Sequence, residues 1–112
     1  PMNLLAGRAD GNVFHLGSEV LALPAAAPAH RELVLGARPE HAVLAASGWP
    51  LKVEMVEMLG AERPVHGRLG DHGFTVRLDA TLPPPRAGDM VRMWVAPAHL
   101  HWFDPQTLSR VP

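Results

Sequence analysis

The chain contains no cysteine, and this absence excludes disulfide bridges, thiolate metal sites and a cysteine nucleophile in one step. It also has no apolar run near the ~18 residues that a membrane-spanning helix needs. Nothing in the sequence therefore predicts a transmembrane segment, and we expect a soluble chain.

The motifs of several enzyme classes are also missing. The single lysine, Lys52, lies in Pro-Leu-Lys-Val with no glycine beside it, so there is no phosphate-binding loop of the G-x-x-x-x-G-K-[ST] type. The hydrolase pattern G-x-S-x-G does not occur. We therefore predict no catalytic residue and no cofactor-binding residue, and expect that this chain is not itself an enzyme.

The charge balance gives little support to nucleic-acid binding. Ten Lys and Arg face eleven Asp and Glu, for a formal net charge of −1, and tyrosine is absent. Single-strand binders combine a basic groove with aromatic platforms. We expect no nucleic-acid partner.

The residues that are present predict one β-rich domain. The 112 residues are 47% hydrophobic, enough for one core, while twelve prolines and ten glycines interrupt the chain too often for long helices. Short runs with apolar residues at every second position indicate strands. The predicted strands cover residues 4–8, 12–16, 19–23, 33–36, 65–69, 74–78, 91–95 and 100–103.

Two features refine this pattern. Residues 70–73 predict a four-residue hairpin loop, and Asp10-Gly11 predicts a turn that lets 12–16 pair with 4–8 and with 19–23. Residues 51–59 fit either a strand with a bulge near Met55-Val56 or a helix, because Pro50 precedes and Gly60 follows them.

The densest polar cluster is Arg38-Pro39-Glu40-His41, directly after a buried run. Pro39 pushes Arg38 into an extended conformation and ends the strand. Arg38 and Glu40 could form an ion pair, and His41 could donate to a backbone carbonyl. The cluster is either a structural corner or a contact point for a partner domain.

Trp94 is the first candidate for an interface with another subunit. It lies on the Arg92 side of its strand, opposite Val91, Met93 and Val95. Trp49 and Trp102 are expected in the core or at its edge.

Two histidines and two glutamates are the candidates for metal binding and acid–base catalysis. His99 and His101 would share one face of a strand, but only Asp104 lies near as a further donor, so no metal site is predicted. Glu54 and Glu57 lie close in sequence, yet a bulged strand would turn both toward solvent, away from a cleft that could raise their pKa values.

Five segments in order along the chain carry a family resemblance. They are residues 1–7, 35–41, 57–62, 65–68 and 100–104. Together they resemble the C-terminal regulatory domain of ATP-binding subunits of bacterial sugar-importing ABC transporters of the maltose type. His-Gly-Arg at 66–68 and the ending Leu-His-x-Phe-Asp are most similar to the subunits for sn-glycerol-3-phosphate import.

The resemblance implies an all-β, oligonucleotide/oligosaccharide-binding-like barrel of the TOBE type, with about eight or nine short strands and little helix. Residues 51–59 should then be strand. Residues 1–112 would form a single C-terminal regulatory domain, with Pro1 as a cut point. Between residues 74–78 and the C-terminus the chain is shorter than the maltose-type pattern. A particular regulator-binding surface of the family is therefore not carried over to it.

The resemblance also implies partners. A nucleotide-binding domain absent from this chain would carry ATP and Mg and contact the transmembrane permease subunits. The expected partners are a second copy of the same subunit and a regulatory protein. The location would be cytoplasmic, peripheral on the inner face of the bacterial cell membrane.

Two functions follow from these expectations. The first is a regulatory and dimerisation domain of an ATP-hydrolysing importer subunit. The alternative is a small-ligand or oxyanion sensor, with the anion near Arg38, Arg68 or Arg77.

Overall fold

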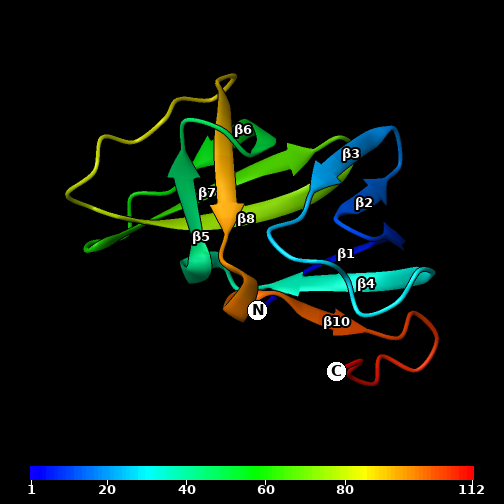
Figure 1. Cartoon of the computed structure of the whole chain (residues 1–112). Coiled ribbons are helices and arrows are strands. Elements are labelled where there is room, and N and C mark those ends of the chain that lie inside the picture. The colour runs from blue at the N-terminus through cyan, green and yellow to red at the C-terminus, as the bar shows by residue number, and fades with distance from the viewer.

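The structure is a computed structural model that describes all residues, 1–112, as two curled five-stranded antiparallel sheets (Figure 1). The strand orders are β10-β4-β1-β2-β3 and β5-β9-β6-β7-β8. The elements are β1 (Asn3–Asp10), β2 (Val13–Leu16), β3 (Glu19–Ala22), β4 (Glu32–Ala37), η1 (Pro39–His41), β5 (Ala42–Ala45), β6 (Trp49–Val56), β7 (Glu62–Leu69), β8 (His72–Asp79), β9 (Met90–Val95), η2 (Pro97–His99) and β10 (His101–Phe103). The predicted all-β, OB-like barrel is confirmed, with ten strands.

Tight glycine turns connect the hairpins. β2 pairs with β1 and with β3, as predicted from Asp10-Gly11. The loop between β7 and β8 is shorter than predicted, because Leu69 pairs with His72 and only Gly70 and Asp71 remain outside the ladder. Gly70 has φ 60°, a conformation that glycine adopts without the strain a side chain would add. The prediction of a four-residue loop was therefore wrong.

The ambiguous segment is a strand. β6 pairs with β7 and β9, and its register shifts between Val53 and Met55, one or two residues before the predicted bulge. The strand ends at Val56, and Leu59 makes an isolated bridge to Glu62. The strand that the resemblance implied for residues 51–59 is thus confirmed, although it ends at Val56.

The sequence reading missed β5 and the two 3₁₀ turns. Each turn begins with a proline, at Pro39 and Pro97, which fits the first helical position. β5 escapes the pattern because its small residue Ala42 is buried while Val43 faces solvent. No helix in the structure has the length and apolar character needed to span a bilayer.

The core lies between the two sheets. Strand alternation places Val65, Leu69 and Phe74 inside, as predicted, and β4 is buried along its whole length after Glu32. Trp49 and Trp102 belong to this core, also as predicted. All 22 buried side chains named in the core are apolar, so burial of hydrophobic surface is the main force that closes one sheet on the other.

Candidate interaction surface

An open groove of about 620 Å³ lies between β3 of one sheet and the outer face of β5, β9 and β6 of the other. β3 and β5 are the edge strands of their sheets. The lining residues are Glu19, Val20, Ala22, Val43, Ala45, Ser47, Gly48, Trp49, Pro50, Arg92 and Trp94.

Two tryptophans form the floor of this groove. The Trp49 indole N–H donates to the carbonyl of Ala22 over 2.7 Å and so ties β6 to β3 across the two sheets. Trp94 meets Trp49 edge to face, with ring centroids 6.3 Å apart. Trp94 is half-buried on the outer face of β9, where the sequence placed it, and its cross-strand partner is Val43.

The walls of the groove expose apolar side chains and carry one charge of each sign. Val20 is 57% exposed and Val43 is 55% exposed, which is high for valine. Glu19 forms no ion pair within the chain, and Arg92 donates only to the carbonyl of Gly48 over 3.3 Å. The groove therefore combines an apolar floor with two unpaired charges at its rim.

The Arg38-Glu40-His41 corner differs in its contacts from the sequence expectation. Arg38 and Glu40 form no ion pair. The pKa of Glu40 is lowered chiefly by a hydrogen bond from its own backbone N–H and, among the charges, most by Arg77. His41 donates to no backbone carbonyl. It stacks on His99 with ring centroids 3.8 Å apart, and its Nδ1 is buried without a hydrogen-bond partner.

A second, polar pocket of about 300 Å³ lies near the start of β1. His66 bridges two neighbours there: its Nε2 lies 2.6 Å from the Glu57 carboxylate and its Nδ1 lies 3.0 Å from the Thr75 hydroxyl. The Asn3 side chain donates to the Thr75 carbonyl and accepts from the Thr75 N–H, both over 2.9 Å. Sequence reasoning missed this network and expected Glu57 to face solvent.

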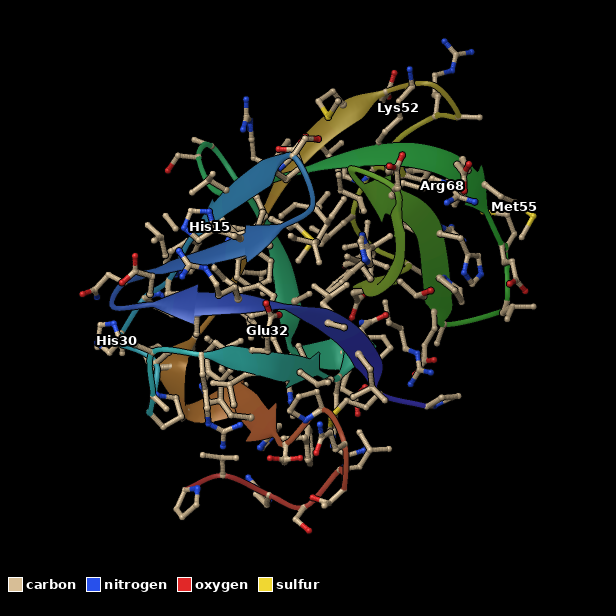
Figure 2. The ribbon with its side chains drawn as sticks, turned by 90° about the vertical axis from the view of Figure 1, so that its right-hand side faces the viewer. His15, His30, Glu32, Lys52, Met55 and Arg68 are labelled. Atoms are coloured by element: carbon tan, nitrogen blue, oxygen red, sulfur yellow. The ribbon has the colours of Figure 1, made fainter.

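The three arginines considered for an anion have different surroundings. Arg68 is held by the Glu54 carboxylate at 3.1 Å and by the Asp71 carbonyl. Figure 2 shows it beside Lys52 and Met55, away from Glu32 of the other sheet. The Arg77 Nε lies 3.2 Å from the Glu62 carboxylate, although the two are not aligned for a hydrogen bond. Arg38 has no carboxylate partner within the chain.

His99 and His101 do not share one strand, since η2 ends at His99 and β10 begins at His101. Asp104 accepts hydrogen bonds from the backbone N–H groups of Gln106 and Thr107, and it pairs with Arg31 at 3.3 Å. Asp104 therefore fixes the turn after β10. No group of three or more His, Asp or Glu side chains is arranged to hold a metal ion.

Comparison with known proteins identifies the family. The family model described as the TOBE domain matches residues 35–103. Three sn-glycerol-3-phosphate import ATP-binding proteins align with nearly all of this chain: those of Bordetella pertussis (40% identity, 99% of this chain, 33% of that protein), Cereibacter sphaeroides (39%, 98% and 32%) and Shigella sonnei (42%, 98% and 33%).

The chain thus spans about a third of the length of the curated relatives it matches. The match confirms the resemblance seen in the sequence motifs. It covers the strands from β4 to β10, including β5 and β9 on one wall of the groove. The chain belongs to the TOBE domain family.

Proposed function

We propose that this chain is the regulatory and dimerisation domain of the ATP-binding subunit of an ABC importer, for sn-glycerol-3-phosphate or a related sugar-type solute. The support is the TOBE match together with relatives whose names describe ATP-binding proteins for sn-glycerol-3-phosphate import. ATP and Mg would be bound by a nucleotide-binding domain outside residues 1–112. That domain would carry the hydrolysis and contact the permease subunits at the inner face of the bacterial membrane.

The observation that carries the dimerisation proposal is the groove beside Trp94. Contiguous exposed apolar surface on a soluble protein marks an interaction site. The occupant we propose is a second copy of the same groove, because a two-fold interface is self-complementary. Glu19 of one copy would then face Arg92 of the other, and both charges lack a carboxylate or guanidinium partner within the chain.

The size of the groove sets the expected strength. A stable interface buries about 1,600 Å² in total, whereas this groove is lined by eleven residues, of which six are hydrophobic. The isolated domain should therefore associate weakly, and the nucleotide-binding domains would add to the contact in the whole subunit. A regulatory protein would bind outside this interface.

The test is sedimentation equilibrium of the chain up to about 1 mM, a concentration that detects association worth only about 4 kcal/mol. Val20→Ser with Val43→Ser should abolish association, and because both side chains are more than half exposed, the fold should persist. The control is Met58→Ser with Leu82→Ser, which removes equally exposed apolar side chains that do not line the groove.

A strictly monomeric wild-type chain would overturn the proposal, and so would equal loss of association in the control. Trp94→Ala is a weaker test on its own, because Trp94 also packs against the buried Trp49. Its unfolding should be followed alongside its association.

A further inference from the structure

Five positively chargeable side chains gather where η1, η2, β10 and the C-terminal tail meet. They include three of the seven histidines of the chain. In Figure 1 the two short helical turns lie next to each other below β5, and β10 leaves from the same place. The side chains are Arg38, His41, His99, His101 and Arg110.

The contacts within this basic cluster are between like groups. His41 and His99 stack with an interplanar angle of 20°. A guanidinium N–H of Arg110 donates a hydrogen bond to Nδ1 of His101. The Nδ1 of His41 is buried and has no hydrogen-bond partner, which is uncommon for a buried polar atom.

Carboxylates do not balance these charges. Other arginines of the chain face acids, as Arg31 faces Asp104 and Arg68 faces Glu54, but Arg38 and Arg110 have no such partner. The charges of Arg77, His41 and Arg38 all lower the pKa of Glu40, and Arg77 has the largest effect of the three.

The electrostatic consequence appears at His101. Burial lowers the pKa of His101, and the charges of Arg110, Arg38, His41 and His99 lower it further. Protonation of this imidazole is therefore opposed by its surroundings. An anion placed among these groups would reverse the effect, because an opposite charge favours the protonated form.

We propose that the basic cluster binds a phosphate-type dianion, either inorganic phosphate or the phosphate group of a small monoester. Two guanidinium groups without carboxylate partners match the charge of a dianion, and their planar donors suit phosphate oxygens. The Nε2–H of His101, which is a donor while Nδ1 accepts from Arg110, and the unpartnered Nδ1 of His41 supply further polar groups. This site is separate from the groove beside Trp94 and does not depend on the dimer.

The proton linkage gives the site a signature. Binding should be accompanied by proton uptake at His101, because the surroundings lower the pKa of this imidazole in the free chain and a bound anion raises it. The charged groups that face the histidines of the cluster are Arg38, Arg110 and the acid Glu40, with the Arg31–Asp104 pair near the tail. Glu40 stays ionised because its pKa is lowered, so the groups that change protonation on binding are His101 and the anion itself, whose second pKa is about 6 for a phosphate monoester.

The experiment is an NMR titration of the histidine ring protons with inorganic phosphate and, in a second arm, with sn-glycerol 3-phosphate. Sodium chloride of equal ionic strength is the control for screening. Saturable shifts at His41, His99 and His101 are expected, with the pKa of His101 raised by at least about 0.5 unit at saturation. Binding in either arm supports the site and tells which source of phosphate it accepts.

Substitutions distinguish a specific anion site from non-specific attraction of the anion to positive charge. Arg38→Gln with Arg110→Gln should weaken binding at least about tenfold, the loss of two charge-assisted contacts. The control Arg8→Gln with Arg86→Gln removes the same charge from two arginines that form no ion pair and lie outside the cluster. Shifts equal to those in sodium chloride, or equal weakening in the control pair, would overturn the proposal.

Discussion

The Asn3 side chain holds the start of the chain to the outer edge of β8, and its removal should destabilise the fold measurably. Its amide makes two hydrogen bonds of 2.9 Å to the backbone of Thr75, a residue 72 positions away. β8 is the edge strand of its sheet, so these backbone groups have no neighbouring strand on that side. The Asn3 amide takes the place of a neighbouring strand for these two groups.

The expected cost follows from these two bonds. In Asn3→Ala both Thr75 groups lose their partner in a half-buried place, where water replaces it only in part. At about 1 kcal/mol per bond, the free energy of unfolding should fall by about 2 kcal/mol. For a domain of this size, the midpoint temperature should fall by roughly 10 °C.

Urea unfolding followed by tryptophan fluorescence measures this change, and the slope against urea should stay constant. Asn12→Ala is the matched control, because Asn12 is exposed and its side chain makes no hydrogen bond. Asn3→Asp keeps the acceptor for the Thr75 N–H but sets a second carboxylate oxygen against the Thr75 carbonyl oxygen, so it should not restore the wild-type stability. The reasoning fails if Asn3→Ala and Asn12→Ala unfold within about 0.5 kcal/mol of each other.

Two further predictions concern packing and pH. Gly67→Ala should destabilise the chain by about 2 kcal/mol in urea unfolding, because its Cβ would lie 2.4 Å from the carbonyl oxygen of Lys52; Gly73→Ala, which meets nothing within 4 Å, should change little. Hydrogen bonds from the Thr107 and Gln106 N–H groups lower the pKa of Asp104 in the folded chain. The ionised carboxylate therefore stabilises the fold fully at a pH above the pKa that Asp104 has in the unfolded chain. This stabilisation is lost as the pH falls through the lower pKa of the folded chain. The stability gap between the wild type and Asp104→Asn should therefore narrow in urea unfolding below about pH 4, and a constant gap would contradict the assignment.

The strands that the sequence predicted best are those with strict alternation. In residues 65–69 of β7 and 74–78 of β8 every second residue is buried, because a strand turns successive side chains to opposite faces. β5 could not be found in this way, since its buried residue is Ala42 and its exposed residue is Val43. The short loop at Gly70 was also missed, because Gly73 reads as a turn residue and instead lies within β8.

The sites depend on contacts that leave no local signal. Trp94 was found because its position on the outer side of β9 follows from alternation alone. The contact between Asn3 and Thr75 was not predicted, because a side chain that binds the backbone of a distant edge strand leaves no motif in the sequence. Arg38 and His41 were singled out for their density in sequence, but the groups that join them, His99 and Arg110, arrive through the fold.

The arrangement of strand edges gives a separate reason to place association at the groove. Exposed strand edges invite pairing with another chain, so proteins cover them. The edge of β8 is covered by Asn3, and that of β10 by the C-terminal tail, where the Val111 N–H donates to the Trp102 carbonyl. The outer edges of β3 and β5 have no backbone partner; only the carbonyl of Ala22 is occupied, by Trp49.

Both uncovered edges border the same groove, and each presents its exposed valine there. Two of the four sheet edges are thus closed by contacts from elsewhere in the chain, while the other two lie open beside this groove. If these edges served no partner, a charged residue at Val20 or Val43 would be the usual protection against aggregation. Glu19 and Arg92 are the two charged residues of the groove, one of each sign, so a second copy turned by a two-fold axis would set each against its opposite while it covers both valines.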